Sequence, residues 1–294
     1  MRSACAMPTV TATIFRDGGG RRGRSGAPPG ATVLAAFGLE GQPVPLSGGQ
    51  GRAWLVDEAV LKPLDMSLPA LRWHAELLAR LAGRDDLRVS EPLPATDGEW
   101  NSSGWTAWRH QPGVHLPGRW NEIIAVGERL HTALHDEAKP AFLVDRTDIW
   151  AVADRVAWDE LPPEAFAVTR HLDTLLAASR PVRGTAQLVH GDLTGNVLFH
   201  PELPPLVIDL SPYWRPPAFA IAVVIADALV FEGAHPGVFQ PLLADSTFQQ
   251  HLLRALIFRT VADHLARPHL RRPEADDPYH PAVTLAVGLA QASR

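Results

Sequence analysis

The sequence contains a single cysteine, Cys5, among its 294 residues. One cysteine cannot form a disulfide within the chain, and it cannot build a metal site from cysteine ligands. Scarce cysteine is typical of proteins from a reducing compartment. We therefore expect a fold that is held together by an apolar core, and a cytoplasmic location.

Long apolar runs are also absent. No stretch approaches the eighteen or more apolar residues that a membrane-spanning helix needs, so we expect no contact with a membrane. The most apolar segment, residues 219–231, is too short, and it contains Asp227. A carboxylate in such a segment needs a polar partner, and we expect a structural role for it.

The charge is unevenly distributed. Residues 1–30 contain five Arg, one Asp and many Gly and Pro, and this composition predicts a disordered extension. The whole chain carries −5, so the remainder carries −9. An acidic body argues against nucleic acid as a partner. It favours cationic ligands, although a need for solubility explains the same charge.

The first third of the body is rich in strand signals. A hairpin is predicted over residues 53–62, and Ser67 is the expected N-cap of the helix that follows. Further strands are expected at 88–89 and 105–108, around an Asp-Gly turn. The Pro- and Gly-rich segment 109–118 then marks the best domain boundary.

Helical periodicity dominates the rest of the chain. Helices are predicted over residues 121–138, 147–160, 163–179, 219–231 and 252–266, followed by an irregular, Pro-rich tail over 267–281. We therefore predict an α+β chain with a β-rich N-lobe (31–110) and a larger, mainly helical C-lobe (111–294). A cleft between two such lobes is the expected ligand site.

A polar loop between short apolar strands interrupts the helical half. The loop and the strand that follows it, within residues 188–209, carry side chains suited to phosphoryl transfer. Such chemistry needs a carboxylate beside the attacking hydroxyl, and oxygen ligands for Mg²⁺. The candidates are His190, Asp192, Asn196 and Asp209.

Two of these candidates, Asp192 and His190, have an alternative role. Asp192 is the candidate base, although an isolated Asp in such a loop more often caps a turn. Asn196 and Asp209 are the candidate metal ligands. His190 is expected to stiffen the loop by donating to a backbone carbonyl or to Asp209, and a catalytic proton role is the alternative.

A second group of candidates lies in the strand-rich part. Lys62 ends the second strand of the hairpin and is placed to contact phosphates, with Glu76 of the next helix as its partner. A Gly-rich turn precedes the hairpin, and its glycines allow a close approach of backbone to phosphate. These glycines are Gly48, Gly49 and Gly51.

Three segments together resemble the aminoglycoside phosphotransferase family, within the protein-kinase-like superfamily. They are His190-Gly191-Asp192 with Asn196-Val197-Leu198-Phe199, then Ile208-Asp209, and the helical segment Gly127 to His131. The resemblance implies a two-lobed kinase-like fold, Mg²⁺, and transfer of a γ-phosphoryl group to a small-molecule hydroxyl. It also implies ATP or GTP bound near Arg109, His110 and Gln111.

Two departures from the family pattern stand out. Three residues separate Asp192 from Asn196, where the family usually has four. The family also commonly has an Asp-Ile/Leu-Ala element after the metal-binding Asp, and residues 219–222 lack that Asp. The shortened loop keeps open an alternative, a kinase-like nucleotide-binding protein without phosphotransferase activity. The acceptor and the oligomeric state are not readable from the sequence.

Overall fold

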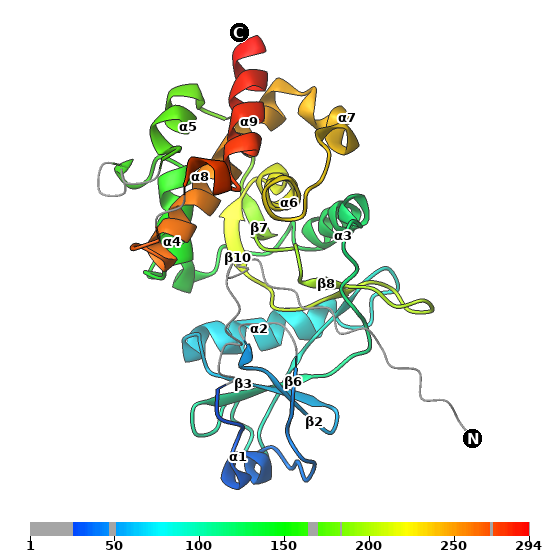
Figure 1. Cartoon of the computed structure of the whole chain (residues 1–294). Helices are drawn as coiled ribbons and strands as arrows, with labels where there is room; N and C mark the ends of the chain where they lie inside the picture. The colour runs from blue at the N-terminus through cyan, green and yellow to red at the C-terminus, as the bar shows by residue number, and fades with distance from the viewer. Residues whose placement is uncertain (1–25, 47–50, 164–169, 183, 271–272, 294) are drawn as a thin grey trace, which may run out of the picture. The chain divides into compact units, whose positions relative to one another are not determined.

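The computed structural model describes residues 26–46, 51–163, 170–182, 184–270 and 273–293 (Figure 1). The predicted disorder of residues 1–30 falls almost wholly outside these ranges, as do Gly48 and Gly49. The chain divides into two compact units. The first contains residues up to 116 together with 195–210, and the second contains 117–194 and 211–294.

The first unit is built on a five-stranded sheet in the order β1-β2-β3-β6-β5, with antiparallel neighbours. The tight turn between β2 and β3 places Asp57 at φ 51°, a conformation that Asp tolerates better than most residues. The strands are β1 (Val44–Pro45), β2 (Trp54–Val56), β3 (Ala59–Pro63), β5 (Pro92–Leu93) and β6 (Trp105–Arg109).

Two helices, α1 (Ala31–Ala36) and α2 (Leu68–Leu81), lie on opposite sides of this sheet (Figure 1). Val33 of α1 packs into an apolar cluster with sheet residues that include Val56 and Leu61. The Ser67 hydroxyl accepts a hydrogen bond from the Ala70 N–H at 3.3 Å, which confirms the predicted N-cap of α2.

A smaller, three-stranded sheet brings residues 195–210 into the first unit. Its order is β4-β9-β8, with β4 parallel to β9 and β8 antiparallel to β9. The strands are β4 (Arg88–Val89), β8 (Val197–Leu198) and β9 (Leu206–Val207). The Arg88 guanidinium donates to the Pro204 carbonyl at 2.9 Å, and Val114 forms a bridge with Phe199.

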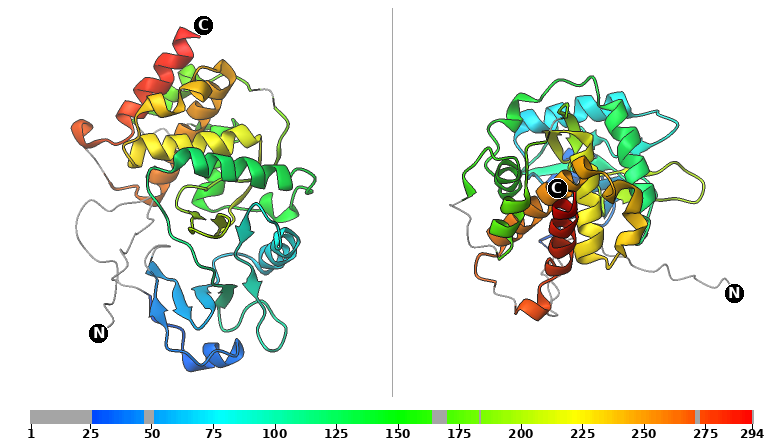
Figure 2. Two further views of the ribbon diagram at one scale, coloured as in Figure 1. Left: turned by 90° about the vertical axis from the view of Figure 1, so that its right-hand side faces the viewer. Right: turned by 90° about the horizontal axis from the view of Figure 1, so that it is seen from above.

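The second unit is mainly helical. Most of its longest helix, α8, is buried, including every residue from His251 to Asp263, because α4, α5, α6 and α9 all pack against it. Figure 2 shows α6 lying beside α3. The helices are α3 (Trp120–Ala133), α4 (Ile149–Ala157), α5 (Leu172–Ala178), α6 (Pro217–Phe231), α7 (Gln240–Leu243), α8 (Ser246–Ala266) and α9 (His280–Ala292), with short 3-10 turns at Ala141–Leu143, Pro236–Phe239 and Glu274–Asp276.

Two strands of the second unit form a buried antiparallel ribbon. They are β7 (Gln187–His190) and β10 (Pro212–Arg215), and Val189 pairs with Tyr213. The sequence predicted β7, but neither β10 nor α9 was predicted. The α+β class, with a β-rich unit and a helical unit, is confirmed. In the described part of the chain, no helix is both long and apolar enough to cross a bilayer.

Candidate functional site

In the first unit, the structure joins Lys62 to Asp209, which lies 147 positions later in the chain. Lys62 is the fourth residue of β3, and its ammonium forms an ion pair with the Asp209 carboxylate. The two side chains are 26% and 40% exposed, so both are within reach of a ligand. The Lys62 ammonium also lies 5.8 Å from the centre of the Trp108 ring. The fold thus brings a phosphate-binding candidate to a metal-binding candidate.

Asn196 and Asp209 lie at the same end of the β8–β9 hairpin. The Ile208 N–H donates to the Asn196 carbonyl at 3.0 Å, one step beyond the pairing of Val197 with Val207. Asp209 has φ 49°, a left-handed conformation that is uncommon for residues other than glycine and concentrates at functional sites. The Asn196 and Asp209 side chains both carry oxygen atoms, which suit Mg²⁺. This ion takes few protein ligands and keeps water or phosphate oxygens.

His74 connects α2 to the segment after β9 that carries Asp209. The ring is 3% exposed, and its Nε2 lies 3.0 Å from the Leu210 carbonyl oxygen while Nδ1 lies 2.8 Å from that of Ala70. The sequence places Glu76 beside the apolar face of the same helix, as the expected partner of Lys62. Two residues along a helix correspond to about 200° of rotation, so Glu76 faces outward when His74 faces inward.

The outward position of Glu76 separates it from its predicted partner. Glu76 is exposed and lines an open hollow on the surface with Arg72 and Trp73. The ion pairs of the described residues join Lys62 to Asp209, and none joins Lys62 to Glu76. The structure therefore does not bring together the predicted Lys–Glu pair.

The remaining nucleotide-binding candidates of the first unit are only partly described. Gly51 has φ 67°, which permits a sharp turn before β2. Arg109 ends β6 beside Glu91, at 3.7 Å between Nε and Oε2, and the backbone N–H of His110 donates to the Glu58 carbonyl oxygen. The Gln111 amide donates to the Val89 carbonyl at 2.6 Å, so this side chain ties the segment to β4.

In the second unit, the loop after β7 carries Asp192 and is held by two histidines. His190 is fully buried, and its Nδ1 accepts from the N–H groups of Asp192 and Ser211, both at 3.3 Å. The His190 N–H in turn donates to Nε2 of His131 at 3.1 Å. His190 therefore stiffens the loop by accepting hydrogen bonds, where the sequence suggested donation.

Two glycines let neighbouring elements approach this loop closely. A Cβ atom on Gly191 would lie 2.4 Å from the Tyr213 ring of β10, and a Cβ atom on Gly127 of α3 would lie 2.5 Å from the Leu193 side chain. Neither distance leaves space for a methyl group. The segment from Gly127 to His131 of α3, which resembles the family pattern, thus approaches this region at both ends. Gly127 lies close to Leu193, and His131 accepts from the His190 N–H.

Arg259 of α8, which was not predicted from the sequence, contacts Asp192 directly. An Nη2–Oδ1 distance of 2.7 Å joins the two side chains, and Arg259 also binds both carboxylate oxygens of Asp227. Burial raises the pKa of the Asp227 carboxyl to about 6, although the Arg259 guanidinium opposes this shift. Asp227 gave a signal in the sequence, because it is the one charged residue of an apolar helical segment and such a carboxylate needs a partner.

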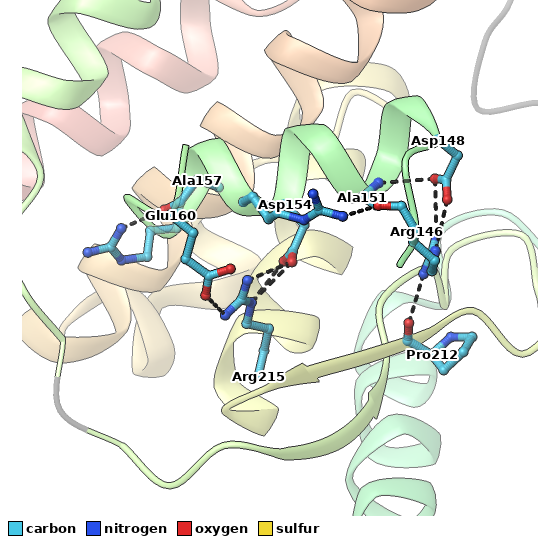
Figure 3. A network of polar contacts seen from close by, with 10 residues as sticks. Arg146, Asp148, Ala151, Asp154, Ala157, Glu160, Pro212 and Arg215 are labelled. Atoms are coloured by element: carbon cyan, nitrogen blue, oxygen red, sulfur yellow. Dashed lines mark hydrogen bonds and ion pairs between the residues drawn. The ribbon is translucent and has the colours of Figure 1, made fainter. Parts of the chain in front are cut away.

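A polar network on α4 supports the β10 side of the loop (Figure 3). Arg215 of β10 binds Asp154 at 2.7 Å and Glu160 at 2.5 Å. Arg146 binds Asp148 and donates to the Pro212 carbonyl at 3.0 Å, and its guanidinium lies over the Tyr213 ring. These charges are matched within the protein, so the network fixes β10.

Acid is expected to destabilise the fold through its buried histidines. Burial, with a smaller effect from His190, lowers the pKa of His131 to about 3, and burial beside Arg254 lowers that of His251 to about 4. In the unfolded chain both rings take up a proton near pH 6.5, whereas in the folded chain they stay neutral. Folding stability should therefore fall as the pH falls from 6.5 to 5, by roughly 2 kcal/mol for each ring.

Urea unfolding between pH 5 and 7 measures this loss. The matched variant is His131→Gln, whose amide oxygen still accepts from the His190 N–H but does not titrate. Its stability should change less with pH than that of the wild-type protein. Equal pH dependence of the two proteins would contradict a neutral, buried His131.

The comparisons with known proteins bear on the fold. No family model matches the sequence, and no curated protein matches it. Solved structures do match. One is a microcompartment-associated aminopropanol kinase, with 17% identity, a TM-score of 0.54, and coverage of 88% of this chain and 94% of the other.

Two further matches have similar statistics. A spectinomycin phosphotransferase, solved in complex with ADP and spectinomycin, has 15% identity, a TM-score of 0.52, and coverage of 89% and 96%. A choline/ethanolamine kinase family protein from Mesorhizobium loti has 14% identity, a TM-score of 0.51, and coverage of 89% and 97%. The chain thus has the kinase-like fold of the aminoglycoside phosphotransferases and choline kinases, as its motifs predicted.

Proposed function

We propose that this protein is a small-molecule kinase that transfers the γ-phosphoryl group of ATP or GTP to a hydroxyl group of a small acceptor. The bond between the γ-phosphorus and its bridging oxygen breaks, and a bond from that phosphorus to the acceptor oxygen forms. Asp192 takes the proton of the acceptor hydroxyl. The products are a phosphorylated acceptor and a nucleoside diphosphate.

The observation that carries this proposal is the pairing of Lys62 with Asp209. Phosphoryl transfer requires a cation for the phosphates and a carboxylate for the metal in one place, and the ion pair between these two residues, which are far apart in the sequence, supports this assignment. Lys62 would contact the phosphates, while Asn196 and Asp209 would hold Mg²⁺. The ion would neutralise charge on the phosphate oxygens.

The solved structures of similar fold support a small-molecule acceptor, because their names describe kinases of amino alcohols and antibiotics. The charge of −9 beyond residue 30 favours an acceptor that carries an amine. We therefore rank amine-bearing alcohols first, including choline-like compounds and aminoglycosides, and sugar-like alcohols second.

The proposal is tested by screening pooled acceptors for release of nucleoside diphosphate from Mg·ATP and Mg·GTP. We expect at least one pool to raise the rate well above the acceptor-free rate, and ³¹P NMR to show a new phosphate ester. Asp192→Asn is the control that removes the signal. No turnover with any pool would contradict the proposal, whether or not the nucleotides stabilise the protein in a thermal melt.

One observation favours a second function. The three-residue spacing between Asp192 and Asn196 departs from the family pattern, which suits a protein that binds nucleotide without transferring its phosphoryl group. In that case Mg·ATP would stabilise the protein in a thermal melt, while every acceptor pool would leave the nucleotide intact. The screen therefore separates the two functions.

A further inference from the structure

Arg259 is a fully buried cation whose charge is met by two carboxylates. Its side chain is 1% exposed, and a buried guanidinium without a partner is very costly. Nε and Nη2 donate to the two oxygens of Asp227 at 2.7 and 2.6 Å. This two-point pair joins α6 to α8, and it fixes the plane of the guanidinium.

The same guanidinium reaches the loop of the second unit. Nη2 of Arg259 donates to Oδ1 of Asp192 at 2.7 Å, and Asp192 is 31% exposed. The Trp150 and Phe258 rings lie 5.7 and 5.2 Å from the guanidinium carbon, so they restrict its orientation further. Arg259 thus connects a rigid, buried ion pair to a carboxylate at the surface.

We propose that Arg259, held in place by Asp227, is a positioning residue that fixes the Asp192 carboxylate for proton transfer. The inference rests on the proposed kinase function, in which Asp192 is the base. Arg259 itself contacts neither the acceptor nor the nucleotide in this arrangement, and it acts through Asp192. Its hydrogen bond to Oδ1 sets the rotation of the carboxylate.

Arg259 is shared by two carboxylates, Asp192 and Asp227, and this sharing makes it easier for Asp192 to accept a proton. A guanidinium paired with Asp192 alone would oppose protonation of that carboxylate strongly, because the proton would leave a buried cation without a counter-charge. With Asp227 present, the three groups carry −1 before Asp192 takes the proton and 0 afterwards. The charges of the buried Arg259–Asp227 pair therefore balance whether or not Asp192 is protonated.

Lysine cannot reproduce this geometry. Its ammonium is a point charge on a flexible stem, whereas the planar guanidinium holds both carboxylates in fixed directions. Arg259→Lys therefore retains the charge but loses the orientation. We expect its kcat to fall about tenfold or more, with the KM for nucleotide and acceptor within about twofold of wild type.

Arg254→Lys is the matched control. Arg254 lies in the same helix and is 3% exposed, but it binds Asp159 and the carbonyl oxygens of Ala157 and Arg180. A general effect of a buried Arg→Lys change on folding would appear in both variants. We expect the kcat of Arg254→Lys to stay within about twofold of wild type.

Asp227→Asn keeps the proposal testable if the Arg259 variants fold poorly. Asparagine keeps the shape of the side chain but removes the charge that anchors Arg259, so kcat should again fall by about threefold or more at constant KM. All assays are run well below the melting temperature of the least stable variant. This keeps every protein folded during the measurement.

The outcomes are distinct. A kcat loss in Arg259→Lys and Asp227→Asn, without one in Arg254→Lys, supports the inference. Equal behaviour of Arg259→Lys and Arg254→Lys overturns it, as does a rise in KM at unchanged kcat. A wild-type protein that binds nucleotide but phosphorylates no acceptor refutes the proposed function itself, and the positioning role falls with it.

Discussion

Replacing Asp192 by asparagine is expected to lower kcat by about 10²–10⁴-fold, the usual contribution of a positioned base. Asparagine has nearly the same shape, and its oxygen can still accept from Arg259, but it cannot take a proton at neutral pH. Nucleotide affinity should persist, because the proposed phosphate and metal contacts come from Lys62, Asn196 and Asp209. Steady-state kinetics and a nucleotide titration measure the two effects separately.

Asp159→Asn is the matched control for Asp192→Asn. Asp159 also pairs with an arginine of α8, at 3.1 Å from Arg254, but it is 65% exposed. Asp159 lies outside the residues proposed to bind the substrates or take the proton, so its replacement should leave kcat within about twofold of wild type, even though it removes a charged partner of the buried Arg254. Undiminished turnover of Asp192→Asn would rule out Asp192 as the base.

Replacing Asp209 by asparagine is expected to remove most of the Mg²⁺ dependence of nucleotide binding. The Mg·ATP dissociation constant should rise by about 10–100-fold or more, the loss that even indirect disruption of a metal site causes. Asparagine is preferred to alanine because Asp209 has φ 49°, which asparagine tolerates and alanine does not. The change therefore removes a charge without straining the backbone.

Thermal-shift titrations with ATP, in the presence and absence of Mg²⁺, measure this effect, because a bound ligand stabilises the folded state in proportion to its affinity. Asp86→Asn is the control in the same unit. Asp86 forms an exposed ion pair with Arg84 at 2.8 Å, and its loss should not alter the response to Mg²⁺. An unchanged Mg²⁺ response in Asp209→Asn would exclude Asp209 as a ligand.

Local signals predicted much of the fold. The β2–β3 hairpin follows from a turn between β-branched runs, and the start of α2 follows from Ser67, because the interactions that form them span only a few residues. The side chains around Asp192 and Asp209 were also identified by their spacing in the sequence. Their roles in nucleotide binding, metal binding and catalysis stay predictions.

Long-range pairing was harder to predict. Residues 195–210 belong with the first unit because β9 pairs in parallel with β4, whereas the sequence order suggested that they belong to the helical half. Glu76 was expected beside the apolar face of α2 and within reach of Lys62, but the helix turns by about 200° between positions 74 and 76, so His74 is buried and Glu76 is exposed. Arg259 was missed because its two partners come from other elements.

Residues 195–210 belong to the first unit although they follow part of the second in the sequence, and this order affects folding during synthesis. Strand β4 is complete at Val89, but its parallel partner β9 emerges more than a hundred residues later. At about 5–20 residues per second, this delay is on the order of ten seconds. The first unit therefore cannot finish folding before about half of the second has been made, and a fragment that ends at residue 116 lacks two strands, β8 and β9, of the three-stranded sheet.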